Sequence, residues 1–141
     1  MKWRDLLKQS MDQTYFATEK LFELVEERDL DWKPESGENW MTTGQLLLHI
    51  SWACGGCMKG FVTGDWSPPK EAEMPGGEDD MMPPAELMPT ASSIVRAKEM
   101  LAEDKHLAYQ LLEQSSDDDL ESKLVYAPWD PKRTTIRDAA A

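Results

Sequence analysis

The sequence predicts an all-α fold: a bundle of helices that forms one domain over residues 1–141. Three observations predict it. Three segments place apolar residues at the three- and four-residue spacing of a helix face, and one of them is apolar almost all round. Glycine- and proline-rich stretches separate these segments. A chain of 141 residues has the length of a single domain with a real core.

The first helix is expected over about residues 2–27. Its apolar face recurs every third or fourth residue, at Trp3, Leu7, Met11, Thr14, Ala17, Leu21, Leu24 and Val25. Charged residues lie mostly on the opposite side, which we therefore expect to face solvent.

The second helix, about residues 43–59, is the most informative segment. Thr42 or Thr43 is suited to cap it, because a threonine hydroxyl accepts a backbone N–H that the first turn leaves unpaired. The apolar run that follows is typical of a central helix, and His49 lies within it. A buried imidazole needs a hydrogen-bond partner or a metal, since burying it unpaired costs about 1–3 kcal/mol. A core histidine bonded to a neighbouring side chain is the simpler interpretation.

Cys54 and Cys57 form a C-x-x-C pair inside the same helix. A redox pair would be expected at the start of a helix that follows a strand. One such pair without further ligands is weak evidence for zinc. The two glycines between the cysteines favour close helix packing, while redox chemistry and a share in metal binding are the other interpretations.

Residues 64–89 contain six of the nine prolines and no helical periodicity. This length predicts a crossover along the bundle, with a lid over a site as an added role. Four methionines indicate that the segment packs on apolar surface: Met74, Met81, Met82 and Met88.

The third helix is expected over about residues 91–114, with Thr90 or Ser92 as its cap. Its stripe is Ile94, Ala97, Leu101, Asp104, Ala108 and Leu111. Asp104 stands where an aliphatic residue would be expected. It either reaches Lys98 or Lys105 at the margin, or it faces the interior and accepts a hydrogen bond from His49. His106 falls on another side of the helix and is expected in solvent, with metal ligation as the minor alternative.

The chain closes with a short β-prone stretch at residues 124–126, a proline-rich turn and a truncated fourth helix over residues 135–141. Three amphipathic helices would leave one interior stripe uncovered, and each large uncovered side chain forfeits about 1.5–3 kcal/mol of burial. We therefore expect a homodimer in which equivalent helices pack about a two-fold axis.

Charge and hydropathy exclude two classes of partner. A net charge of −12 and a pI near 4.5 repel nucleic acid and anionic lipid. No apolar run approaches the roughly 20 residues that cross a bilayer, and the N-terminus lacks the apolar core of a signal peptide. A cytoplasmic protein with no nucleic-acid or membrane partner is expected.

Several short motifs, in this order, resemble the DinB-like (DinB/YfiT) superfamily over nearly the whole chain. They are Leu30-Asp31-Trp32-Lys33-Pro34, the run from Asn39 to Ile50, Gly64-Asp65-Trp66, Asp104-Lys105 and Ala127-Pro128-Trp129-Asp130. The resemblance implies a four-helix bundle with a long crossover between helices two and three. It also implies a divalent metal, nickel or zinc, held by three histidines. His49 matches the ligand on the second helix; the other two belong on the fourth helix and are not present.

The resemblance implies a metal-dependent enzyme of unknown substrate, for thiol transfer or hydrolysis, with an incomplete metal site. In that reading His49 holds the metal, Asp104 orients His49, and Cys54, Cys57 and His106 are minor accessory candidates. The alternative is a non-catalytic helical interaction or stress-response module that self-associates. A small-molecule ligand fits either reading, and the catalytic residues and the enzyme assignment stay open. The sequence shows no Ser/His/Asp constellation of a nucleophilic hydrolase, and this supports the non-catalytic alternative.

Overall fold

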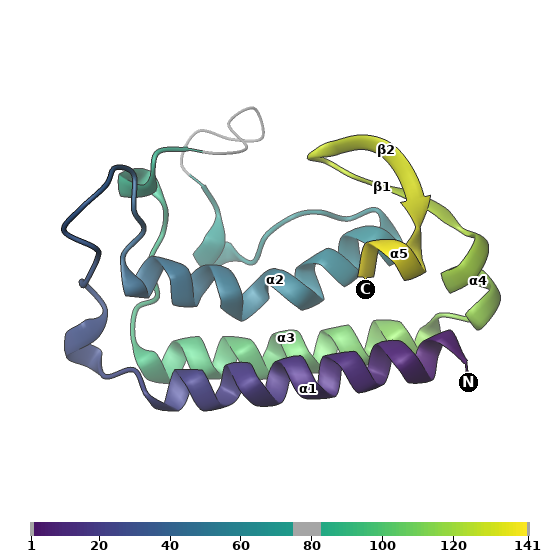
Figure 1. The fold of residues 1–141 in the computed structure, drawn as a ribbon, viewed down its shortest axis with the longest axis horizontal. Coiled ribbons are helices and arrows are strands. Elements are labelled where there is room, and N and C mark those ends of the chain that lie inside the picture. The colour runs from purple at the N-terminus through teal and green to yellow at the C-terminus, as the bar shows by residue number, and fades with distance from the viewer. Residues whose placement is uncertain (1, 75–82, 141) are drawn as a thin grey trace.

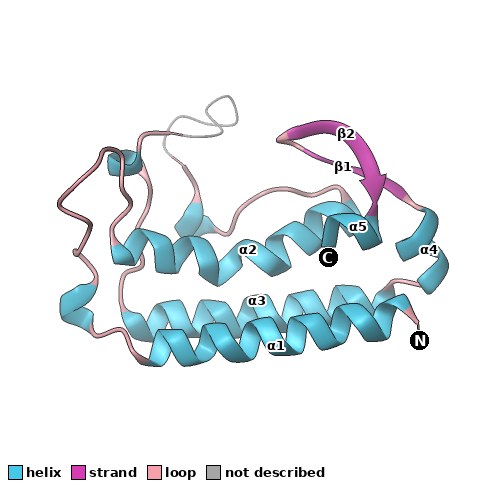
Figure 2. Cartoon of the chain, viewed as in Figure 1, coloured by secondary structure: helices cyan, strands magenta, loops and turns pink. Residues whose placement is uncertain are grey.

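Three long helices form the body of the protein in the computed structural model, which describes residues 2–74 and 83–140. They are α1 (Trp3–Glu23), α2 (Thr43–Thr63) and α3 (Ile94–Gln114). Each has 21 residues and is therefore about 31 Å long. The helices lie side by side, with α1 and α2 both packed against α3 (Figure 1). The predominantly helical fold that the sequence predicts is confirmed (Figure 2).

The caps explain where α2 and α3 begin. The Thr42 hydroxyl accepts the Gln45 N–H at 3.2 Å, and the Gln45 side chain accepts the Thr42 N–H at 2.8 Å. This confirms Thr42 as a cap. Helix α2 continues to Thr63, four residues beyond the expected end, and stops at Gly64 in the left-handed region (φ 81°). Helix α3 is capped by the Ser93 hydroxyl, which accepts the Arg96 N–H at 3.0 Å, and not by Thr90 or Ser92.

The predicted apolar stripe is buried along α3 but only partly buried along α1. All six stripe residues of α3 are buried, as the periodicity predicts. They include Asp104, which therefore faces the interior and does not lie at the margin beside Lys98 or Lys105. On α1 the buried residues are Leu7, Met11, Tyr15 and Phe22. The prediction was wrong for the other part of the α1 stripe, since four of its members are exposed: Thr14, Ala17, Leu21 and Leu24. Helix α1 has two adjacent apolar faces, and α3 covers only one of them.

Short elements follow α3 at one end of the bundle. They are α4 (Asp117–Ser122), the antiparallel hairpin of β1 (Leu124–Ala127) and β2 (Asp130–Thr135), and α5 (Ile136–Ala140). Helix α4 was not expected; Ser116 caps it by accepting the Asp119 N–H at 3.0 Å. Helix α5 falls within residues 135–141, the range in which the sequence predicts a short last helix, and it packs against both α1 and α2.

The crossover from α2 to α3 is attached to the bundle where the structure describes it. It contains two short 3-10 turns, Lys70–Ala72 and Ala85–Leu87, and a third such turn, Glu27–Asp29, precedes α2. The buried Gln45 amide donates to the backbone oxygens of Ala85 (2.6 Å) and Met88 (2.9 Å). Met81 and Met82 lie outside the described residues. No helix within the described ranges is long and apolar enough to cross a membrane.

Candidate functional site

His49 lies on the outer side of α2 and is exposed to solvent. Its ring meets the Trp52 ring edge-on, with the centroids 6.2 Å apart. The prediction of a buried imidazole was wrong, because α2 buries only the face that packs on α3, and His49 is on another face. The cost of an unpaired buried imidazole therefore does not arise, since water can reach the ring.

Asp104 is the buried polar centre of the bundle. Only 6% of this residue is exposed. Its carboxylate accepts a hydrogen bond from the Tyr15 hydroxyl on α1 (2.7 Å) and another from the Gly55 N–H on α2 (2.8 Å). The expected partner His49 makes no hydrogen bond to it, and Lys105 instead pairs with Glu19 at 2.8 Å. One carboxylate thus joins all three long helices.

Burial raises the pKa of the Asp104 carboxyl above its ordinary value, because a low-dielectric surrounding disfavours the charged form. The hydrogen bonds from Tyr15 and the backbone stabilise the carboxylate and oppose this rise. Burial also raises the pKa of the Tyr15 hydroxyl, so Tyr15 remains the donor in this pair.

Gly55 allows α2 and α3 to approach closely at this carboxylate. A Cβ at this position would lie 2.5 Å from Asp104 Oδ1 and 2.6 Å from the Asp104 backbone oxygen. Both distances are shorter than any normal contact, so only glycine fits without a shift of the helices. This geometry supports the packing interpretation of the C-x-x-C segment.

Cys54 and Cys57 are both free and half-buried. Burial raises the pKa of each thiol, and the contact of Cys54 with Tyr15 opposes the rise only in part. Because the thiolate is the reactive and metal-binding form, a raised pKa makes both thiols poor nucleophiles and poor ligands at neutral pH. Their environment is therefore unlike that of a redox pair.

The candidate metal ligands lie apart from one another in the described part of the chain. His106 is exposed on α3, in a shallow depression with Asp12, Lys105 and Tyr109. Among the residues that the structure describes, no three His, Cys, Asp or Glu side chains gather in an arrangement that could hold a metal ion. A catalytic divalent centre usually needs about three protein ligands, so these residues do not fit one.

The most distinctive surface is the side of α1 and α2 that α3 does not cover. We call it the open face; its members recur at helical spacing and include no Asp, Glu, Lys or Arg. On α1 and its C-cap they are Leu6, Ser10, Gln13, Thr14, Ala17, Leu21 and Leu24; on α2 they are Leu46, His49, Ile50, Ala53 and Cys57. Large side chains are well exposed there, with Leu21 at 62%, Leu24 at 76% and Leu46 at 43%.

Helix α5 covers one end of the open face. Ile136 is only 1% exposed, and the Arg137 guanidinium lies 4.6 Å from the centre of the Trp3 ring on α1. Figure 1 shows α5 beside the C-terminal end of α2. Half of the predicted α1 stripe belongs to this surface. The sequence therefore marks these residues as apolar at helical spacing, but it does not distinguish an exposed apolar face from a buried one.

Comparison with known families completes this description. No curated protein and no solved structure matches the chain. A family model of the DinB superfamily matches residues 10–141, a range that runs from α1 through the crossover and α3 to the C-terminal elements. The chain therefore belongs to the DinB superfamily.

Proposed function

We propose that this chain is a self-associating helical module of the DinB superfamily, and that the open face is where a second copy binds. The observation that carries the proposal is the composition of that face. In a protein whose residues are 30% charged, two long helices each present an exposed stripe with none of the four charged residue types. Large apolar side chains exposed in such stripes are typical of an interaction site.

A second copy of this chain is the occupant that we propose. Helix α5 already packs at one end of the face and buries Ile136 there. A further helix along the remaining length would continue the same packing. A two-fold axis brings identical surfaces together, so an apolar stripe on each copy is complementary to itself.

The net charge of the protein also favours an apolar dimer interface over one built from ion pairs. Each copy carries a net charge of −12, so two copies repel at long range. The open face has no acidic residue, and the repulsion comes from the periphery, where salt screens it over about 8 Å at physiological ionic strength. Self-association through this face should therefore strengthen as salt is added, whereas an interface of ion pairs would weaken.

Sedimentation velocity across a wide range of protein concentration tests the proposal. We expect a concentration-dependent dimer that added sodium chloride stabilises. Ala17→Glu on α1 places a charge in the open face and should abolish the dimer. Ala102→Glu is the matched control, because Ala102 is also an exposed helical alanine but lies on α3. A monomer at all concentrations, or equal effects of the two substitutions, would contradict the proposal.

A metal-dependent enzyme of unknown substrate, for thiol transfer or hydrolysis, is the second candidate. Its support is the DinB match together with the place of His49, which lies on the open face with its ring in solvent. In a dimer built on this face, the two copies of His49 would supply two of the about three protein ligands that a nickel or zinc centre needs. Asp104 is not proposed as its partner, since Tyr15 and Gly55 bind that carboxylate.

Elemental analysis of the mildly purified protein tests this candidate. We expect nickel or zinc that His49→Ala removes and His106→Ala, at the other exposed histidine, retains. Metal that survives His49→Ala, or none in the native protein, would leave the interaction module as the function.

A further inference from the structure

A cavity of about 210 Å³ lies between α2 and α3, on the other side of α2 from the open face. The segment Ser67–Pro69 forms its third wall. Its apolar lining consists of Trp52, Pro68, Pro69, Met100 and Leu107. An engineered cavity of about 150 Å³ binds benzene, while pockets for drug-sized ligands begin near 300 Å³. The volume thus suits a single ring with a short substituent.

Gly56 leaves space beside α2 for the Trp52 side chain, which forms the aromatic wall of the cavity. A Cβ on Gly56 would lie 2.7 Å from Trp52 Cε3. The lack of a side chain there lets the indole of Trp52 lie along α2 at the edge of the cavity. The indole is half-buried, so it can contact a ligand while its body packs on the helix.

Lys59, the basic residue of the lining, has no donor to offer a ligand. Its ammonium donates to the backbone oxygen (2.8 Å) and hydroxyl (3.3 Å) of Ser67, and it pairs with Asp65 at 3.2 Å. An ammonium has three N–H groups, and these three contacts use them all. Hydrogen bonds from Ser67, supported by Lys59, lower the pKa of Asp65 to about 2, so the pair stays charged at neutral pH.

The remaining polar groups of the lining accept hydrogen bonds. The Asp104 carboxylate already accepts hydrogen bonds from Tyr15 and from the backbone of α2, so its role in the lining is its negative charge. Ser51 donates its hydroxyl proton to the Leu48 backbone oxygen at 2.7 Å and keeps its own lone pairs. One carboxylate oxygen of Glu103 accepts a hydrogen bond from the Arg96 guanidinium at 3.1 Å. Its other oxygen makes no hydrogen bond to the described residues.

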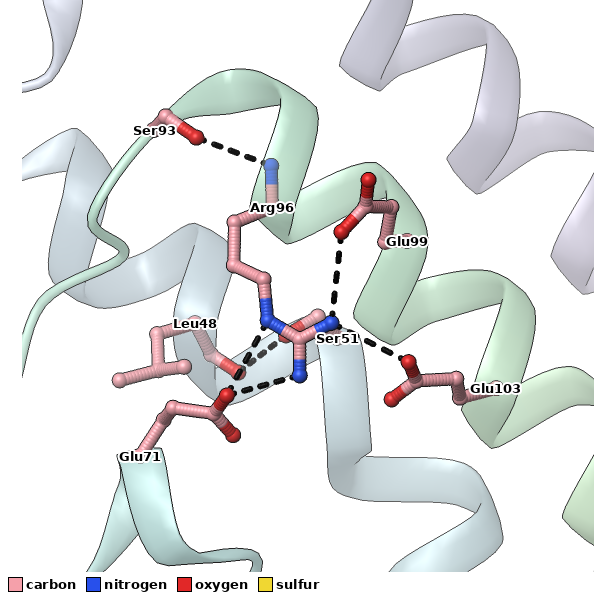
Figure 3. Close-up of polar contacts among 7 residues, drawn as sticks. All are labelled: Leu48, Ser51, Glu71, Ser93, Arg96, Glu99 and Glu103. Carbon is pink, nitrogen blue, oxygen red and sulfur yellow. Dashed lines mark hydrogen bonds and ion pairs between the residues drawn. The ribbon is translucent and has the colours of Figure 1, made fainter.

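Glu103 lines the cavity and also belongs to an acidic cluster next to it. Arg96 is the centre of that cluster, where one guanidinium faces three carboxylates, those of Glu71, Glu99 and Glu103, at 2.7–3.5 Å (Figure 3). One positive charge against three negative ones leaves an excess of negative charge in the cluster, which reaches the cavity through Glu103. A negative potential and a wall of acceptors attract a positively charged donor and repel an anion.

We propose that this cavity binds a small organic cation, a protonated amine that carries one ring. The ring lies against Trp52 and the apolar lining, and the ammonium points to Glu103. The indole face adds attraction for the cation. This site uses α2, α3 and the segment after α2, so it is independent of the open face and of self-association.

Three probes that share one ring but differ in charge test the proposal: benzylammonium, benzyl alcohol and benzoate. Amide chemical shifts of the full-length, isotope-labelled protein report where each binds. We expect benzylammonium to give saturable shifts at Gly56, Lys59 and Ser67, with a Kd on the order of 1 mM for a ligand of this size. Benzyl alcohol should bind more weakly, and benzoate should give no saturable shift.

Two glutamines provide the matched variants. Glu103→Gln removes the negative charge that lines the cavity, whereas Glu99→Gln removes an equally exposed partner of Arg96 that does not line it. We expect Glu103→Gln to weaken benzylammonium binding roughly three- to fivefold, the effect of one exposed charge pair, and Glu99→Gln to leave it unchanged. Equal weakening by both variants, binding of benzoate as tight as that of benzylammonium, or no saturable shift at the cavity would overturn the proposal.

Discussion

Helix α2 presents two apolar faces that differ in what covers them. The first packs on α3 and includes the buried residues Leu47, Leu48, Ser51, Gly55 and Met58. Every buried side-chain nitrogen and oxygen in the described residues has a hydrogen-bond partner, so this interface is complete within the chain. The second, part of the open face, keeps Leu46 and His49 in solvent. Apolar spacing therefore shows which faces of a helix can be buried, but not which of them have a partner.

Two tyrosine–aspartate pairs show the same contrast for polar groups. Tyr15 donates to the buried Asp104, and Tyr109 donates to the exposed Asp12. The hydrogen bond from Tyr109 lowers the pKa of Asp12, while burial raises the pKa of Asp104 in spite of a similar bond. The surroundings therefore decide the sign of the shift, because removing water from Asp104 penalises its charge more than its hydrogen bonds stabilise that charge.

The largest expected difference in the free energy of unfolding is between substitutions of two neighbouring residues on α1. Phe22 is 2% exposed and Leu21 is 62% exposed. Phe22→Ala should lower the free energy of unfolding by about 3–5 kcal/mol, because it leaves a cavity in the core. Leu21→Ala should change it by no more than about 0.5 kcal/mol in dilute protein. Urea unfolding at low and high protein concentration measures both. A large cost for Leu21→Ala in the dilute monomer would show that the open face is covered within one chain.

The next difference separates two adjacent glycines in the middle of α2. Gly55→Ala should destabilise the fold by about 1–3 kcal/mol, because its Cβ would meet a rigid backbone oxygen of Asp104. Gly56→Ala meets only the movable Trp52 side chain. Both substitutions gain about 1 kcal/mol of helix propensity, so thermal unfolding of the pair isolates the contact. Equal melting temperatures would mean that α2 and α3 can separate at Asp104 at little cost.

An effect of similar size should separate substitutions of the two tyrosines. Tyr15→Phe leaves one oxygen of the buried Asp104 without its donor and should cost about 1–3 kcal/mol. Tyr109→Phe exposes the Asp12 carboxylate to water, which replaces the lost bond, and should have little effect. Denaturant unfolding of the two variants compares them. The contrast between buried and exposed pairs fails if Tyr109→Phe is the more damaging change.

The smallest effect is a pH dependence that belongs to Asp104. The pKa of its carboxyl is higher in the folded protein than the ordinary 3.8, so the unfolded chain releases this proton first as the pH rises. The contribution of Asp104 to the free energy of unfolding should therefore be largest below pH 3.8. It should decrease as the pH rises from 3.8 through the raised pKa of the folded protein. Carboxyls with lowered pKa, such as that of Asp65, act in the opposite direction. The difference between the native protein and Asp104→Asn, measured by urea unfolding at several pH values, isolates the slope of Asp104. A difference that rises with pH would contradict the assigned direction.

Prediction from sequence succeeded where the signal is local. Thr42 caps α2 through its own neighbour Gln45, and the α3 stripe needs only the periodicity of one helix. It failed where a partner is distant in sequence. Tyr15 lies 89 residues from Asp104, and no local pattern marks it as the donor that replaces His49. The cavity between α2 and α3 was missed for the same reason, since Trp52 and Glu103 carry no common motif.

By itself the sequence determined a helical bundle, the places of its three long helices, their caps within a few residues and the DinB resemblance. These follow from backbone hydrogen bonding and from side-chain spacing, which act within a few residues. The tertiary structure decided which apolar face of α1 and of α2 is buried, that Asp104 binds Tyr15 and Gly55, and that His49 stays in solvent. Those outcomes depend on which helices lie against each other, and periodicity within one helix does not specify its neighbour.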